Sequence, residues 1–326
     1  MPLTPEAQMI VDAASAAFPA LGTDVLHATE ARRLLAARAA PAVEPIPVAE
    51  VRERRVPGPP GAPEVRVRIY RPESAVAAAP TVVFCHGGGF VLCSLDSHDR
   101  FCRAMAVGAE AIVVSVDYRQ APEHRFPAAA EDAYAALCWV ADHAASLGGD
   151  PARLVVAGDS AGGNLAAVTA LLARDRGGPE IARQLLLYPM LDPACATESY
   201  RQNADGYFTT AAHLRWYWRQ YLGSHDGAGP YANPLDADLS GLPAAHIVTA
   251  EFDPLRDEGE DYGQRLRQAG VAAEIQRYDG MFHGFMSMAD HLPEAVRANT
   301  AAYAAVRTAS AERRPTRART RAVTEH

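Results

Sequence analysis

The chain has 326 residues, a formal net charge of −8, and 49% hydrophobic and 21% charged residues. These values are typical of a globular protein with a large core and exclude a disordered or fibrous chain. All 31 basic residues are arginines, which excludes lysine Schiff bases, lysine general bases and a phosphate-binding-loop lysine. No apolar run reaches the ~18 residues that a membrane-spanning helix needs, so we expect no membrane partner.

The cysteines and the first residues bear on the cellular location. The five cysteines form an odd set without CxxC spacing, which indicates free thiols in a reducing compartment rather than a disulfide framework. Residues 1–6 lack the charged and apolar regions of a signal peptide. Together these features predict a cytoplasmic location.

The elements, taken in chain order, predict one large α/β sheet. Residues 5–40 carry an alanine-rich helical pattern, which Pro41, Pro45 and Pro47 end. Strand patterns follow at residues 49–56, 64–70, 80–85, 111–117, 153–158, 184–189, 245–250 and 273–278, and helical patterns at 97–108, 128–146, 161–175 and 257–269. Apolar strands that alternate with helices predict a mainly parallel, eight-stranded sheet with helices on both faces.

Two segments stand outside this alternation, residues 1–45 and about 193–235. The second is rich in large aromatic residues, among them Tyr207, Phe208, Trp216, Tyr217, Trp218 and Tyr221. Aromatic residues at helical spacing more often pack in a core than line a surface. Because both segments are additional to the sheet, we interpret them as a helical cap over a pocket. Residues 46–306 then form the catalytic domain.

Residues 158–163 read GDSAGG and directly follow the apolar run 154–157. This arrangement predicts that Ser160 lies on a sharp turn between a buried strand and a helix, with its hydroxyl exposed as a nucleophile. Gly158 and Gly162 have no side chains to clash where such a turn crowds the strand against the helix. The alternative is a glycine-rich turn with an incidental serine, so the rest of the chain must decide.

Residues 86–89, HGGG, follow the strand at 80–85. Three consecutive glycines allow the backbone to approach a substrate closely, so we expect the N–H groups of Gly88, Gly89 and Ala161 to form an oxyanion hole. A flexible loop is the alternative. We assign His86 to the orientation of this loop and not to proton transfer.

The order serine, acid, histidine along the chain is that of nucleophile-elbow enzymes. Asp253 and His283 complete this order after Ser160, and each follows a predicted strand. Because function gathers at the carboxyl ends of parallel strands, we expect the three to meet. Three other acidic residues are alternatives to Asp253: Glu251, Asp257 and Asp279. Most of the other histidines, for example His143, His213 and His225, are expected to face solvent.

Five motifs in this order carry a family resemblance. They are HGGG at 86–89, DYR…APEH…FPA at 117–128, GDSAGG at 158–163, DPLRD at 253–257 and HGF at 283–285. From about residue 45 to 306 the chain resembles the hormone-sensitive-lipase family of α/β-hydrolases, the bacterial family IV esterases. The resemblance implies the α/β-hydrolase fold, the triad and oxyanion hole given above, a helical cap, and activity on short acyl esters. Gln120 and Arg125 depart from the family's more common leucine and proline.

We therefore expect a serine carboxylesterase that forms an acyl-enzyme on Ser160 and acts on small-molecule esters. Large aromatic residues in the cap would favour acyl chains of about two to six carbons, and the candidate substrate-binding residues are Phe90, Tyr207, Phe208 and Trp216. A deacetylase of a biosynthetic metabolite would use the same residues. A ligand-binding protein without catalysis is a third alternative, although His283 is present.

The remaining features predict few partners. The Arg-rich tail 307–326 is interpreted as a disordered extension, and we expect no nucleic acid to bind. No G-x-G-x-x-G motif follows a strand and no residue cluster has metal-ligand spacing, so we expect no cofactor and no metal. An exposed last strand or helix would suit a homodimer.

Overall fold

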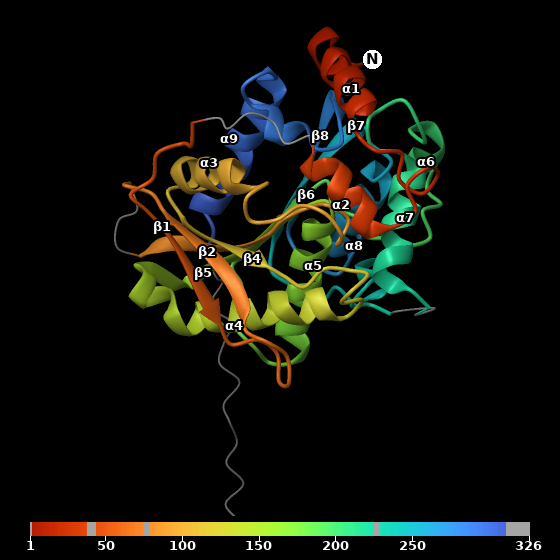
Figure 1. Cartoon of the computed structure of the whole chain (residues 1–326). Coiled ribbons are helices and arrows are strands. Elements are labelled where there is room, and N and C mark those ends of the chain that lie inside the picture. The colour runs from red at the N-terminus through yellow and green to blue at the C-terminus, as the bar shows by residue number, and fades with distance from the viewer. Residues whose placement is uncertain (1, 38–43, 75–77, 225–228, 311–326) are drawn as a thin grey trace, which may run out of the picture.

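The structure is a computed structural model that describes residues 2–37, 44–74, 78–224 and 229–310. Within these ranges, eight strands form one sheet of order β1-β2-β4-β3-β5-β6-β7-β8, at the centre of Figure 1. The strands are β1 Glu50–Val56, β2 Val65–Arg71, β3 Ala79–Cys85, β4 Ile112–Asp117, β5 Gly149–Asp159, β6 Arg183–Leu187, β7 Ala245–Phe252 and β8 Ala273–Phe282. Strands β1, β2 and β4 pair antiparallel, and all pairs from β4 to β8 are parallel. The predicted mainly parallel sheet is confirmed.

Helices cover both faces of the sheet. One face packs against α4 Ala128–Leu147, α5 Ala161–Asp175 and α8 Arg256–Gln268, and the other against α3 Asp99–Ala109 and α9 Pro293–Arg307. In Figure 1, α4 and α5 lie below the sheet and α3 and α9 above it. Every residue of β3 is buried, as expected of a strand with helices on both sides. Two apolar clusters, one on each face, form the core.

The N-terminal segment corrects the prediction of one helical pattern over residues 5–40. It forms two helices, α1 Pro5–Ala17 and α2 Ala28–Ala36, and residues 38–43 lie outside the described residues. Phe18 precedes Pro19, and a residue before proline is driven out of the helical region. Phe18 is accordingly extended, at φ −83° and ψ 140°. The alanine-rich composition hid this break.

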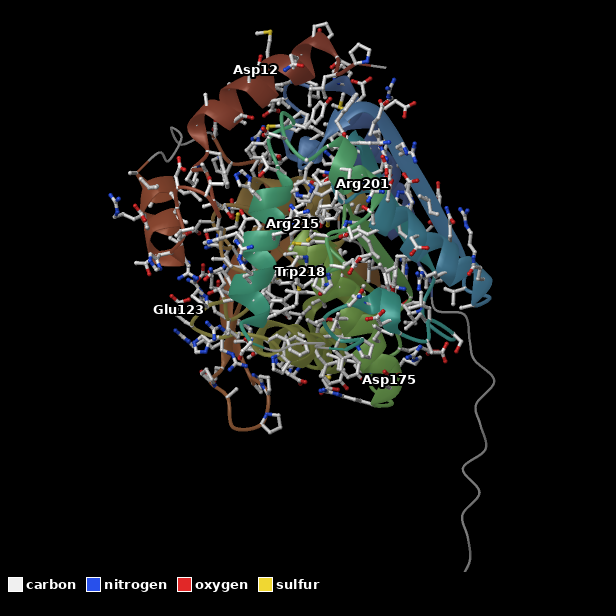
Figure 2. The ribbon with its side chains drawn as sticks, turned by 90° about the vertical axis from the view of Figure 1, so that its right-hand side faces the viewer. Asp12, Glu123, Asp175, Arg201, Arg215 and Trp218 are labelled. Carbon is white, nitrogen blue, oxygen red and sulfur yellow. The ribbon has the colours of Figure 1, made fainter. Side chains whose placement is uncertain are left out.

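The aromatic segment forms α6 Glu198–Gln202 and α7 Ala211–Leu222, followed by the short helix η1 Pro234–Asp236. In Figure 2, α7 runs down the near face beside the N-terminal helices and carries Arg215 and Trp218. Trp216 Nε1 donates a 2.9 Å hydrogen bond to the main-chain oxygen of Leu26. The two segments that are additional to the sheet therefore pack against each other.

Histidine burial on α7 differs from the prediction. His213 was expected to face solvent, but it is buried. Its backbone N–H donates to the Thr210 side chain at 3.1 Å, and its ring centroid lies 5.4 Å from that of Phe18. Burial lowers the pKa of His213 to about 4. His225, also expected to face solvent, lies outside the described residues.

Candidate active site

Ser160 occupies the turn between β5 and α5. Its backbone has φ 55° and ψ −120°, a conformation that costs free energy for any residue with a Cβ and occurs at functional turns. A Cβ on Gly162 would lie 1.9 Å from the main-chain oxygen of Cys85, and one on Gly158 would lie 2.2 Å from that of Gly162. The flanking glycines therefore permit the close contact between strand and helix that the sharp turn requires.

Residues 86–93, here called the oxyanion loop, follow β3 and lie against this turn. Strand β3 pairs with β5, with Cys85 opposite Gly158. Gly88 and Gly89 have φ +103° and +60°, which other residues rarely adopt. Among the described residues, no acceptor is present for the N–H groups of Gly88, Gly89 or Ala161. These groups are therefore free to receive a negatively charged oxygen.

Three side chains from three strand ends form one hydrogen-bonded chain. His283 Nε2 lies 3.0 Å from Ser160 Oγ, and His283 Nδ1 lies 2.7 Å from Asp253 Oδ2. Asp253 is fully buried, whereas Ser160 and His283 are 7% and 8% exposed. Each follows the last residue of its strand, β5, β7 or β8. The structure thus brings together the three residues that sequence order singled out.

Asp253 is held through both its carboxylate and its main chain. Asp253 Oδ1 accepts a 2.8 Å hydrogen bond from the backbone N–H of Leu255, and Asn203 Nδ2 donates to the Asp253 main-chain oxygen at 3.1 Å. Asn203 follows α6, so the aromatic segment supports the acid. The Tyr188 ring contacts the His283 imidazole edge-on, with centroids 4.9 Å apart.

The rival acids have other partners. Glu251 accepts a hydrogen bond from the Gly280 backbone at 2.7 Å. Asp257 accepts one from the Ser199 backbone at 2.7 Å and pairs with Arg256. Asp279 is an exposed residue of β8. Of the four carboxylates, Asp253 is the one at hydrogen-bond distance from His283.

His86 is the first residue of the oxyanion loop and contacts Gly87, His98 and Tyr118. It is fully buried, and burial lowers its pKa to about 4, so the ring is neutral at neutral pH. Its Nδ1 lies 2.7 Å from the Gly87 oxygen, and Tyr118, whose ring stacks on it, donates to the His86 main-chain oxygen at 2.8 Å. These contacts agree with a role in orienting the loop.

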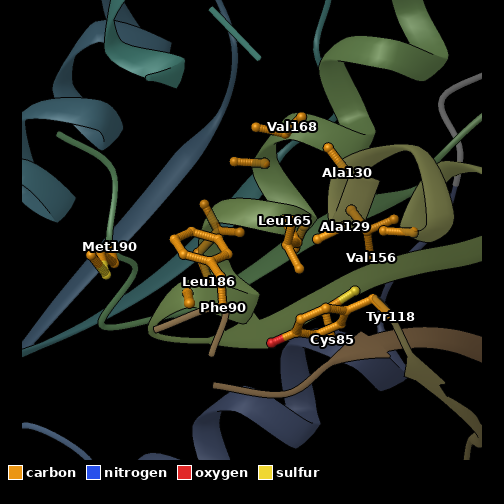
Figure 3. Packing of buried hydrophobic residues seen from close by; sticks show 14 of the residues in the cluster. Cys85, Phe90, Tyr118, Ala129, Ala130, Val156, Leu165, Val168, Leu186 and Met190 are labelled. Carbon is orange, nitrogen blue, oxygen red and sulfur yellow. The ribbon is translucent and has the colours of Figure 1, made fainter. Parts of the chain in front are cut away.

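The candidate substrate-binding aromatics take two kinds of position. Phe90 and Trp216 are buried; Phe90 stacks on Tyr221 with centroids 3.8 Å apart and belongs to the apolar cluster drawn in Figure 3. Tyr207 and Phe208 are partly exposed. Tyr207 packs against Phe252, the neighbour of Asp253, and Phe208 packs against Phe18.

Sequence reasoning missed several residues around the site. Tyr217 of α7 fills the space over Gly89, where a Cβ would lie 2.0 Å from its ring. Arg32 contacts the oxyanion loop at Val91, His98 contacts Asp159, and Asn203 contacts Asp253. His98 follows the HGGG motif closely, which is a weak signal; the other three come from segments whose packing no local pattern reveals.

Two cavities are lined by residues other than Ser160, Asp253 and His283. One, of about 370 Å³, lies between the β1–β2 turn and α4. The other, of about 750 Å³, lies near the starts of β6, β7 and β8, whereas Asp253 and His283 follow the ends of β7 and β8. In the part of the chain that the structure describes, no group of His, Cys, Asp or Glu side chains could hold a metal ion. No helix there is long and apolar enough to cross a membrane. All five cysteines are free.

Comparison with known proteins identifies the family. A family described as the alpha/beta hydrolase fold matches residues 82–287. The chain belongs to the hormone-sensitive-lipase family of α/β-hydrolases. Carboxylesterase NlhH of Mycobacterium tuberculosis is 44% identical over 313 residues, covering 94% of this chain and 96% of the relative. Ethyl acetate hydrolase of Pseudomonas putida is 39% identical over 236 residues, covering 70% and 74%.

A solved structure agrees with these relatives. The hyperthermophilic esterase of the archaeon Pyrobaculum calidifontis superposes with a TM-score of 0.83 at 41% identity, covering 94% of this chain and 98% of that one. The chain is a carboxylic ester hydrolase. The predicted family, fold and enzyme class are therefore confirmed.

Proposed function

We propose that Ser160, His283 and Asp253 are the catalytic triad of a carboxylesterase that hydrolyses short-chain acyl esters. The observation that carries the proposal is the continuous chain of hydrogen bonds from Ser160 Oγ through the imidazole to the Asp253 carboxylate, at 3.0 and 2.7 Å. A serine hydroxyl needs such a base, because it is a weak nucleophile by itself.

The reaction proceeds in two steps. His283 Nε2 takes the Ser160 proton as Oγ attacks the ester carbonyl carbon, and it then protonates the leaving alcohol, which leaves an acyl-enzyme. A water molecule gives its proton to the same nitrogen and attacks the acyl carbon, and Ser160 recovers its proton as the acid leaves. Asp253 holds the proton-bearing Nδ1 and stabilises the imidazolium through its negative charge.

The oxyanion of each tetrahedral intermediate is stabilised by the N–H groups of Gly88, Gly89 and Ala161. Each such donor contributes about 3 kcal/mol to the stabilisation of the transition state. Ala161 opens α5, so the positive end of the helix dipole lies at the same place.

Residues 1–45 and about 193–235 act as a cap that limits the acyl chain to about two to six carbons. The support is the packing of Trp216 against Leu26, of Tyr217 against Gly89, and the low exposure of Ser160, 7%. Phe90 and Trp216 act from within the core, whereas Tyr207 and Phe208 are the better candidates for contact with substrate. A cytoplasmic location, a homodimer and a disordered tail over 307–326 stay predictions; the tail from residue 311 lies outside the described residues.

The test is hydrolysis of p-nitrophenyl esters from C2 to C16 by the wild type and by Ser160→Ala. Activity confined to short chains and lost in the variant supports the proposal, whereas equal activity of the two proteins overturns the role of Ser160. Efficient hydrolysis of C12 or longer esters overturns the short-chain preference alone.

The deacetylase alternative uses the same residues and differs in the bond that breaks. Comparing 4-nitrophenyl acetate with 4-nitroacetanilide separates the two, because the second has an amide in place of the ester. A ligand-binding protein without catalysis would hydrolyse neither, and a phosphonate would not label its Ser160.

A further inference from the structure

Asp159, the residue before the nucleophile, joins the oxyanion loop to α3. Its Oδ1 accepts a 2.9 Å hydrogen bond from the backbone N–H of Gly87. The His98 Nε2 atom lies 3.2 Å from Oδ1 and 3.3 Å from Oδ2 of the same carboxylate. The mechanism above gives no part to Asp159 or to His98.

The contact between Asp159 and the loop is close. A Cβ on Gly87 would lie 2.4 Å from Asp159 Oδ2, so the glycine allows the carboxylate to reach the main chain. Gly87 directly precedes Gly88 and Gly89, whose N–H groups face the reacting oxygen in the proposed function. A displacement of Gly87 would therefore be passed to these donors by the covalent chain.

Asp159 is ionised at this position. Burial raises the pKa of a carboxyl, but His98, together with His86 and the Gly87 N–H, brings the pKa of Asp159 below its ordinary value. An ionised carboxylate accepts hydrogen bonds and cannot donate, so the proton in the contact with His98 is on Nε2. Both side chains are only 15% exposed, which limits competition from water.

His98 itself is held in one orientation. Its Nδ1 lies 2.9 Å from Ser97 Oγ, and Ser97 Oγ lies 2.9 Å from the main-chain oxygen of Ser94. The imidazole also packs against the rings of Phe84 and His86, with centroids 6.2 and 5.5 Å away. The ring is thus fixed on both sides with Nε2 at the carboxylate.

We propose that His98 is a positioning residue: through the Asp159 carboxylate it holds Gly87, and with it the oxyanion loop, in the geometry that stabilises the transition state. The inference rests on the proposed function, because it assigns the loop its catalytic part. It gives His98 no contact with the substrate. In this role His98 acts through its hydrogen bond to Asp159, whereas a residue that only fills space between α3 and β3 would act through its volume alone.

Two substitutions separate these roles. In His98→Gln the side-chain amide places an N–H donor near the position of Nε2, whereas His98→Leu keeps much of the volume and has no donor. We expect His98→Leu to lower kcat on p-nitrophenyl acetate by about 10- to 100-fold, somewhat less than the loss of a whole oxyanion donor. KM should stay within about twofold, and His98→Gln should keep most of the activity.

Amide hydrogen exchange measures the protection of the Gly87 N–H and does not depend on catalytic turnover. In His98→Leu the Gly87 N–H should exchange faster than in the wild type, because its acceptor has lost its support, whereas His98→Gln should protect it. His291→Leu is the control, since His291 is exposed and takes no part in the contact between His98 and Asp159. Should His98→Leu not fold, His98→Asn replaces it, because its amide is too short to reach the carboxylate.

Each result decides the inference. The inference would be overturned if His98→Leu had the kcat and the Gly87 exchange rate of the wild type. It would also be overturned if His98→Gln and His98→Leu lost the same amount of activity. If the wild type hydrolyses no ester of the series, the proposed function fails, and the exchange comparison still decides whether His98 holds the loop.

Discussion

Arg32 Nε donates a 2.9 Å hydrogen bond to the main-chain oxygen of Val91, so helix α2 holds the end of the oxyanion loop. The same guanidinium donates to the Ala121 oxygen at 2.7 Å and pairs with Glu123 at 2.7 Å. Glu123 lies beside α2 at the left of Figure 2, and Arg32 lowers the pKa of its carboxyl. One side chain thus connects the N-terminal segment to two loops of the catalytic domain.

Arg32→Met should loosen this connection while keeping most of the aliphatic stem. We expect a loss of about 1–3 kcal/mol in the free energy of unfolding, since bonds from a charged donor to main-chain oxygens are lost. We also expect faster proteolytic cleavage within residues 18–27. Thermal unfolding and limited proteolysis measure both. Arg33→Met is the matched control, because Arg33 is the exposed neighbour on the same helix; equal effects of the two substitutions would contradict the prediction.

Asp253→Asn tests the assignment of the acid. The amide is almost the same size, but it removes the negative charge that stabilises the imidazolium and permits the wrong orientation of the His283 ring. We expect kcat to fall by about 10³- to 10⁴-fold with the fold intact. Asp279→Asn makes the same change at an exposed rival and should leave kcat within about twofold. A large loss in the control, or none at Asp253, would show that the acid is misassigned.

Gly89→Ala tests the contact between the oxyanion loop and α7. Its Cβ would lie 2.0 Å from Tyr217 Cγ, at φ +60°. The loop or the ring must move, so we expect kcat/KM to fall by about 10²-fold, the effect of one displaced donor. Gly61→Ala is the control for backbone strain alone, because Gly61 has φ +79° and no neighbour within 4 Å.

A second substitution identifies the clash as the cause. Adding Tyr217→Ala to Gly89→Ala frees the space, and part of the lost activity should return. Steady-state kinetics of the two single variants and the double variant give this coupling. Strictly additive losses would mean that the ring and the loop act independently.

The meeting of Ser160, Asp253 and His283 could be predicted because each directly follows a strand and the three occur in the chain order serine, acid, histidine. The strands could be predicted from continuous apolar runs such as 154–157. The break at Phe18 follows from the local effect of Pro19, which the alanine-rich composition hid. The burial of His213 could not be predicted, because it depends on how α7 packs against the N-terminal segment. The contacts of Arg32 and His98 also join residues far apart in sequence, and no local pattern records such pairs.

Glu258, in the first turn of α8, has a buried carboxyl whose Oε1 accepts a 2.6 Å hydrogen bond from the Leu191 backbone. Its Oε2 is buried without a partner among the described residues. Burial raises the pKa of this carboxyl well above its ordinary value. The group is therefore protonated in the folded protein under conditions where it is ionised in the unfolded chain.

The sign of the pH dependence follows from this difference. Below the ordinary glutamate pKa, about 4.3, both states carry the proton and the group adds no pH dependence. Above it the unfolded state releases the proton first, so stability falls with rising pH by up to about 1.4 kcal/mol per pH unit until the raised pKa is reached.

Glu258→Gln removes this titration, because the amide is neutral at every pH and its oxygen still accepts from Leu191. We expect the difference in the free energy of unfolding between variant and wild type to grow in favour of the variant from about pH 5 to pH 8. Urea unfolding at several pH values measures it. Glu30→Gln, at an exposed position of α2, should parallel the wild type. A constant difference across this pH range would show that Glu258 is ionised in the folded protein.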